Sequence, residues 1–129
     1  MNKSRIIKTG QSVLNIEANA INKLSKNLDN EFYEAVASIV NLKGTVIISG
    51  VGKSGNIAAM LAASFTSTGV PAIFLNPVDA SHGDMGIVSK EDILIALSNS
   101  GESHELSDLL DFSKKKQIKI ISITSNKNS

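Results

Sequence analysis

One glycine-rich stretch, Gly50-Val51-Gly52-Lys53-Ser54-Gly55, limits the fold more than any other part of this 129-residue chain. It follows the apolar run 45–49, which predicts a buried strand, and it precedes residues 56–68, which predict a helix. A glycine-rich turn at that place lets the backbone approach a ligand closely. The N-terminus of the next helix adds unpaired N–H groups and a partial positive charge. The stretch therefore predicts a phosphate-binding turn, with Gly52 and Ser54 next to the anion.

Strand-like and helix-like segments alternate after this point. Apolar runs predict four strands, at 45–49, 72–75, 92–97 and 119–123. Helices are predicted at 56–68 and from about residue 106, and the polar segment 76–86 is predicted to be a loop. Continuous apolar strands are typical of parallel sheets that are covered on both faces. We therefore expect an α/β fold, a three-layer open parallel sheet with helices on both faces and ligands at the carboxyl ends of the strands.

The N-terminal part of the chain reads as two helices. Apolar residues recur in steps of seven, three and four along residues 4–28, and a second helix is expected to start at the cap Asp29 or Asn30 and to end at Gly44. We expect one domain over residues 1–129, with N-terminal helices in 4–43 and an α/β part in 44–124. The last predicted strand is followed by six residues, so we expect a domain truncated after its fourth strand or completed by another chain.

Composition excludes several classes of function. The chain has no cysteine, which excludes disulfides and thiolate metal sites, and its formal charge of +1 gives no attraction to nucleic acid or anionic membranes. No signal peptide and no apolar span of about 20 residues is visible in the sequence. We therefore expect a cytoplasmic protein without nucleic-acid or membrane partners.

Three interpretations compete for the first turn. A P-loop would need a glycine at position 47, which is Ile47 inside the predicted strand. A dinucleotide fingerprint fits the spacing of the glycines, but the acidic residue expected after the second strand is missing, since Asn76 stands there and Asp79 comes later. The third interpretation is a sugar-phosphate site, in which the turn and Ser54 approach a single phosphate.

A second turn, 98–103, supports the sugar-phosphate interpretation. It also leaves a predicted strand and opens a predicted helix, and it offers three hydroxyl groups and an amide from Ser98, Asn99, Ser100 and Ser103. Such groups beside free helix N–H groups form a compact oxyanion site. One such turn is ordinary cap chemistry. Two turns at the same edge of one sheet favour phosphate binding.

Several charged residues near these turns are candidates for chemistry. Lys53 could pair with the phosphate or polarise a sugar oxygen, and Glu105 could act as a general base, with Glu102 as its rival. His82 could transfer a proton near a bound sugar. Although histidines and carboxylates occur here, no ligand spacing indicates a metal site, so we expect neither a metal nor a cofactor.

At these residues the sequence resembles the sugar isomerase (SIS) domain family, and within it the arabinose-5-phosphate isomerases. The resemblance runs from about residue 10 to the end and rests on four stretches: Gly50 to Gly55, Phe65 to Pro71, Ala80-Ser81-His82-Gly83-Asp84-Met85-Gly86, and Ser98 to Ser103 with Glu105. It implies a sheet of flavodoxin-like order. It also implies an intramolecular oxidoreductase that interconverts D-arabinose 5-phosphate and D-ribulose 5-phosphate through an enediol, for octulosonate synthesis in lipopolysaccharide or capsule. By this resemblance Lys53, His82 and Glu105 are catalytic, and Ser54, Ser98, Ser100 and Ser103 hold the phosphate.

The sequence departs from that family towards its C-terminal end. A fifth strand, a further histidine in a Ser-His-Pro-Gly-Gly stretch and the usual CBS domains are not found in these residues. The alternative function is therefore a non-catalytic sugar-phosphate-binding fragment or an inactive remnant. The resemblance and the wide apolar stripe of residues 4–28 imply a homo-oligomer, and the missing part suggests a separately encoded C-terminal half as partner.

Overall fold

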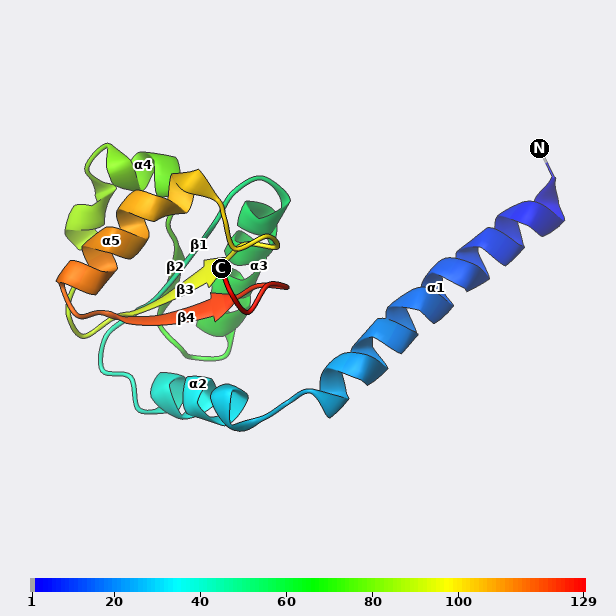
Figure 1. Cartoon of the computed structure of the whole chain (residues 1–129), viewed down its shortest axis with the longest axis horizontal. Coiled ribbons are helices and arrows are strands. Elements are labelled where there is room, and N and C mark those ends of the chain that lie inside the picture. The colour runs from blue at the N-terminus through cyan, green and yellow to red at the C-terminus, as the bar shows by residue number, and fades with distance from the viewer. Residues whose placement is uncertain (1) are drawn as a thin grey trace. The chain divides into compact units, whose positions relative to one another are not determined.

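The computed structural model describes residues 2–129. The chain divides into two compact units, with the boundary between Val36 and Ala37. The elements follow each other as α1, α2, β1, α3, β2, α4, the 3-10 helix η1, β3, the 3-10 helix η2, α5 and β4 (Figure 1).

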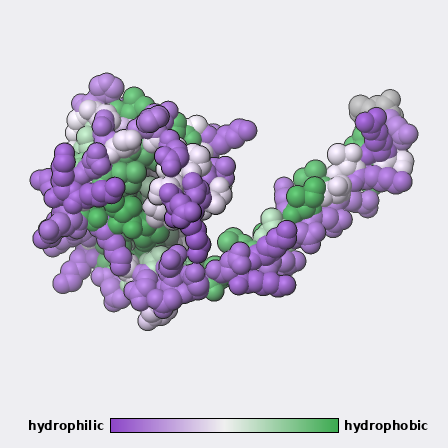
Figure 2. Space-filling model, in the orientation of Figure 1, coloured by the Kyte–Doolittle hydropathy of each residue, from purple (hydrophilic) through white to green (hydrophobic). Residues whose placement is uncertain are grey.

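The first unit contains the long helix α1, Lys3–Lys26. Asn2 caps it, because its side-chain oxygen accepts a hydrogen bond from the Arg5 N–H at 3.3 Å. None of its residues is buried, and a band of apolar side chains runs along it (Figure 2). The predicted helix and its apolar stripe are confirmed.

Helix α2, Asn30–Val40, begins in the first unit and ends in the second. Asp29 caps it as expected, since its carboxylate accepts from the N–H groups of Glu31 and Phe32 at 3.0 and 3.3 Å. The prediction that Gly44 ends this helix is wrong, because the helix stops at Val40. Gly44 instead passes close to another segment: a Cβ there would come within 2.5 Å of the Glu91 carbonyl oxygen.

The second unit is built on a four-stranded parallel sheet in the order β2-β1-β3-β4. The strands are β1 (Val46–Gly50), β2 (Ala72–Phe74), β3 (Ile93–Leu97) and β4 (Lys119–Ile123). Every residue of β1 and β3 is buried, as expected for continuous apolar runs in the middle of a parallel sheet. The predicted open parallel α/β sheet and its flavodoxin-like order are confirmed.

Helices cover both faces of this sheet, which makes the predicted three layers. On one face α3, Lys53–Ser67, packs Ala58 and Ala62 against alternate residues of β1 and β3. On the other face α4 (Pro77–Ser81) and α5 (Ser107–Lys115) contribute Ala80 and Leu109 to a second apolar cluster (Figure 1). The sheet thus separates two cores, which together fix the strands whose ends carry the site.

Two expectations about local structure are wrong. Helix α3 begins at Lys53 rather than at residue 56, because Gly52 adopts φ +57° and turns the chain within one residue. The segment 76–86 is not a loop but contains α4 and η1, Asp84–Ile87. Asn76 caps α4 by accepting from the Val78 N–H at 3.0 Å, and Pro77 occupies the first helical position, which suits proline.

Within the described residues, none of the helices combines the length and the apolar character that crossing a bilayer would require.

Candidate functional site

The register of the sheet brings three turns to one edge. Gly50 of β1 pairs with Leu97 of β3, and Leu97 pairs with Ile123 of β4, so these three strands end side by side. The segments that follow them, starting at residues 51, 98 and 124, therefore leave from the same carboxyl edge. This is the edge at which open parallel sheets bind ligands. The two turns singled out in the sequence do meet at one edge.

The first turn is held tight by glycines. A Cβ on Gly55 would lie 2.8 Å from the Gly50 carbonyl oxygen, so the start of α3 lies directly against the end of β1. The helix ladder opens with a hydrogen bond from the Asn56 N–H to the Gly52 carbonyl at 3.1 Å. The side chain of Lys53 is exposed and that of Ser54 is half-buried. Both residues stand in the first turn of α3, where an anion is stabilised by free N–H groups.

The second turn is held by its own hydroxyl groups. The Ser98 and Ser103 oxygens lie 2.8 Å apart, and the Ser98 hydroxyl also accepts from the Gly101 N–H at 3.0 Å. Ser98 is only 8% exposed, so its hydroxyl closes the turn from inside. Asn99 and Ser100 are exposed, and the Ser100 oxygen accepts from the Glu102 N–H at 3.2 Å. The structure therefore presents Asn99 and Ser100 to solvent, while Ser98 and Ser103 shape the turn.

His82 lies at the C-terminal end of α4, and its ring is oriented by the backbone. Its Nδ1 lies 2.8 Å from the Val78 carbonyl oxygen. Because a carbonyl can only accept, Nδ1 carries the proton of the neutral ring and Nε2 keeps its lone pair. The segment that leads from β2 to α4 is held at its start, because the buried Ser49 hydroxyl donates a hydrogen bond to the Leu75 carbonyl at 2.7 Å. The hydrogen bond to Val78 therefore fixes the orientation of the exposed imidazole.

Glu105 lies in η2, His104–Leu106, which packs against α4 and leads into α5. Its side chain is exposed, as is that of Glu102 in the turn before it. Glu105 and His82 therefore stand on neighbouring short helices on one face of the sheet, while Lys53 starts the helix on the other face. Within residues 2–129, no hydrogen bond links these three side chains, and no three histidine or acidic side chains gather in a group that could hold a metal ion.

A third turn follows β4, and it was not predicted from the sequence. The Asn99 carbonyl accepts from the Ser125 hydroxyl at 2.6 Å, from the Ser125 N–H at 3.2 Å and from the Thr124 hydroxyl at 3.4 Å. The sequence contained an indication of this turn, because Thr124 and Ser125 directly follow an apolar strand, just as Ser98 directly follows β3. The third turn is therefore bonded to the most exposed part of the second.

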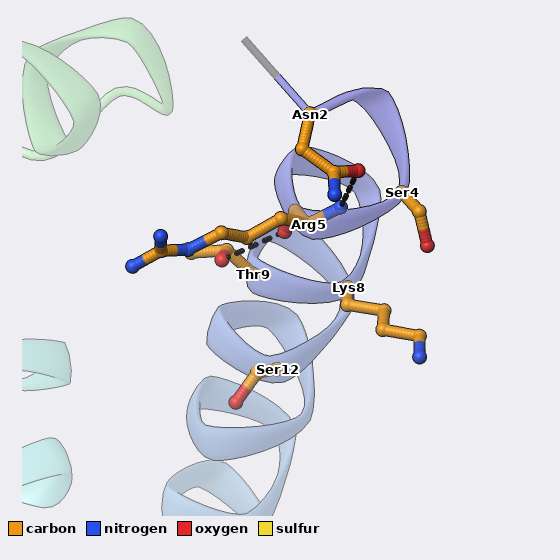
Figure 3. Close-up of a pocket in the computed structure, with 6 residues that line it drawn as sticks. All are labelled: Asn2, Ser4, Arg5, Lys8, Thr9 and Ser12. Atoms are coloured by element: carbon orange, nitrogen blue, oxygen red, sulfur yellow. Dashed lines mark hydrogen bonds between the residues drawn. The ribbon is translucent and has the colours of Figure 1, made fainter.

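A shallow hollow of about 390 Å³ lies on the first turns of α1 (Figure 3). Its lining residues all come from one helix and its cap: Asn2, Ser4, Arg5, Lys8, Thr9 and Ser12. Their hydrogen bonds are local, such as that from the Thr9 hydroxyl to the Arg5 carbonyl at 2.9 Å. None of the predicted site residues lines this hollow, and it offers no enclosed site.

An open parallel sheet with glycine- and serine-rich turns at its carboxyl edge defines a class of α/β domains that bind ligands at that edge. Within that class the chain belongs to the SIS domain family, whose pattern matches residues 38–129. This confirms the family resemblance read from the sequence.

Individual relatives agree with this assignment. The arabinose 5-phosphate isomerase KdsD of Yersinia pestis is 42% identical over 120 residues, which are 93% of this chain and 37% of that protein. A crystal structure from Listeria monocytogenes matches with a TM-score of 0.95 at 36% identity and covers all of this chain and 68% of its own. A protein of Escherichia coli CFT073, solved in complex with arabinose 5-phosphate, matches with a TM-score of 0.93 at 37% identity and covers 100% of this chain and 69% of its own. The chain thus spans less than half the length of the KdsD enzyme it matches and about two thirds of the two structures.

Proposed function

We propose that this chain provides the phosphosugar-binding part of an isomerase that interconverts D-arabinose 5-phosphate and D-ribulose 5-phosphate. The observation that carries the proposal is the pair of turns, 51–54 and 98–103, at one carboxyl edge of the sheet. The 42% identity to a KdsD isomerase and the close fit to a structure holding arabinose 5-phosphate support this substrate. The pathway that this activity would serve is octulosonate synthesis for lipopolysaccharide or capsule.

In this proposal the phosphate binds between the two turns. Exposed N–H groups of Gly52 and the start of α3, the Ser54 hydroxyl, and the groups of Asn99 and Ser100 would donate to its oxygens. Ser98 and Ser103 would act mainly by holding the second turn in shape through their 2.8 Å contact. A dianionic phosphate beside several aligned N–H donors is bound by charge-assisted hydrogen bonds, which are the strong kind.

The chemistry proposed for the bound sugar is a proton transfer through an enediol. A base removes a proton from C2 of the aldose, and the carbonyl oxygen at C1 becomes an enediolate. Lys53, in the first turn, would stabilise that negative charge. Transfer of the O2 proton to O1 and return of a proton to C1 then complete the ketose. His82 through its free Nε2 and the exposed Glu105 are both candidates for the base.

Isotope exchange tests the isomerase proposal. Purified chain is incubated with D-ribulose 5-phosphate in deuterated water, and exchange of the C1 proton is followed by NMR. Exchange above the rate without protein is expected, and Lys53→Ala should abolish it, because the lysine acts on charge that develops during the reaction. Absence of exchange with the intact chain would refute catalysis by this chain.

A second candidate is a sugar-phosphate-binding module without turnover. It requires only the two turns at the carboxyl edge of the sheet and none of the proposed proton-transfer residues. This candidate predicts that arabinose 5-phosphate binds at the two turns while no C1 exchange occurs. Exchange and binding measured on the same sample separate the two candidates.

We also propose that the chain works as a homo-oligomer. The support comes from α1, where large apolar side chains such as Leu14 and Ile21 are 66% and 67% exposed. Exposed apolar side chains in a continuous band mark a protein contact surface. Light scattering of the purified chain checks this, and a stable monomer at tens of micromolar would contradict it.

A further inference from the structure

The most unusual hydrogen bonding near the candidate site is at the carbonyl oxygen of Asn99. Three donors from the turn after β4 converge on this one atom, at 2.6, 3.2 and 3.4 Å. Two of the donors, the hydroxyl and the N–H, belong to Ser125. A carbonyl oxygen has two lone pairs, so the two Ser125 bonds alone satisfy it fully. This carbonyl is therefore tied to the end of β4 although Asn99 itself is exposed to solvent.

The direction of this carbonyl also sets the direction of a neighbouring donor. All peptide bonds in residues 2–129 are trans. In a trans peptide unit the C=O of one residue and the N–H of the next point in opposite directions. Because the Asn99 carbonyl points to the turn after β4, the Ser100 N–H points away from it.

The order of the strands shows what lies on that other side. β3 lies between β1 and β4, so the direction away from β4 leads toward the turn after β1. That turn holds Gly52, Lys53 and Ser54, with which the second turn shares the carboxyl edge of the sheet. Within the described residues the Ser100 N–H donates to no other group. A free backbone donor is thus directed to the place where both turns would meet an anion.

We propose that Ser125 is a positioning residue for the phosphate site: its two hydrogen bonds to the Asn99 carbonyl hold the Ser100 N–H ready for a phosphate oxygen. Ser125 does not touch the ligand in this scheme. It acts by fixing a donor before the ligand arrives, so that less ordering is needed on binding. This inference rests on the proposed function, because it assigns a role within the same site.

The test compares three variants with the unchanged chain. Ser125→Ala removes the hydroxyl that makes the shortest of the three bonds, and Ser125→Thr keeps a hydroxyl at the same atom. Ser122→Ala is the matched control, because it removes a serine hydroxyl from β4 that makes no hydrogen bond in the described part of the chain. Thermal unfolding of all three shows whether any effect is a general loss of folding.

The first readout needs no ligand. In the free protein, Ser125→Ala should shift the ¹³C resonance of the Asn99 carbonyl and the amide resonance of Ser100, while Ser122→Ala leaves both in place. The second readout is the affinity for D-arabinose 5-phosphate measured by calorimetry. Ser125→Ala should weaken it about two- to tenfold, the usual effect of one hydrogen bond, and Ser125→Thr should restore it.

Failure of the inference and failure of the proposed function give different results. If the unchanged chain binds the sugar phosphate and Ser125→Ala binds it equally well, the positioning role is refuted and the proposed site stands. If the free-protein resonances of Asn99 and Ser100 do not move in Ser125→Ala, the positioning role is refuted without reference to any ligand. If the unchanged chain binds no sugar phosphate, the proposed function fails, and the role of Ser125 in it falls as well.

Discussion

The close approach of Gly55 to Gly50 leads to a specific prediction for Gly55→Ala. A Cβ at residue 55 would lie 2.8 Å from the Gly50 carbonyl oxygen and 3.4 Å from its carbon. Ordinary contacts between such atoms are roughly 3.5 Å, so the start of α3 would have to move by about half an ångström or more. Gly50 cannot give way easily, because it is the last residue of the buried strand β1 and pairs with Leu97 of β3.

The size of the effect follows from two opposing terms. Overpacking of this kind costs about 1–3 kcal/mol, and the better helix propensity of alanine returns less than about 1 kcal/mol at the first turn of a helix. We expect a net loss of about 1–2 kcal/mol. For a unit of the size of Ala37–Ser129 this lowers the melting temperature by about 4–16 °C.

Scanning calorimetry is the appropriate assay, because the chain has no tryptophan to report unfolding by fluorescence. Gly10→Ala is the matched control: it makes the same substitution within α1, where a Cβ would meet nothing within 4 Å. It should raise helical content by circular dichroism and leave the melting of the second unit unchanged. An unchanged or raised melting temperature for Gly55→Ala would refute the tight junction between β1 and α3.

Two further predictions concern stability. Asp92 is only 7% exposed, and its carboxylate accepts hydrogen bonds from the N–H groups of Thr45 at 2.8 Å and Ser89 at 2.6 Å. Asp92→Ala should therefore lower the free energy of unfolding in urea by about 2–4 kcal/mol. Asp92→Asn keeps one acceptor oxygen and should lower it by less. Equal losses in the two variants would contradict the bidentate role. The Ser113 hydroxyl is buried and has no hydrogen-bond partner in the described residues, so Ser113→Ala should be neutral or stabilise the fold by up to about 1 kcal/mol. A loss above that size would show that the hydroxyl has a partner.

The sheet could be predicted from the sequence because each of its strands is marked by the residue types within its own short segment. Each strand is a short apolar run between turn residues, and β1 and β3 are continuous runs because both of their faces are covered. The helix predicted from about residue 106 is α5, Ser107–Lys115, and Leu109 and Ser113, one turn apart on it, are fully buried. Such patterns depend on the residue types of one segment and not on distant contacts.

Helix α4 could not be predicted because tertiary contacts stabilise it. It has only five residues, and the polar, glycine-containing segment around it reads as a loop. It forms because Asn76 caps it, Pro77 suits its first position and Ala80 is fully buried against the second core. The pair Asn76-Pro77 indicated the start of a helix, but the polar, glycine-containing composition of the segment favoured a loop.

The candidate site was predictable as a set of turns but not as a network. Parallel strands place their carboxyl ends together, so the meeting of Gly52 with Ser98 and Ser100 at one edge followed from the order of elements. The different roles of the hydroxyl groups within the second turn could not be predicted, because only the structure shows that Ser98 is buried and hydrogen-bonded to Ser103. The contact of Ser125 with Asn99 joins residues 26 positions apart, and no local pattern contains it.

The most direct test of the central claim is a titration of the ¹⁵N-labelled chain with D-arabinose 5-phosphate, followed by amide resonances. We predict saturable shifts in two groups of residues, 52–55 and 98–103, with the same dissociation constant, and no comparable shifts along α1. D-arabinose, which lacks the phosphate, should produce far smaller shifts at the same concentrations. Saturable shifts confined to other residues, or none in either turn, would contradict a phosphosugar site at this edge of the sheet.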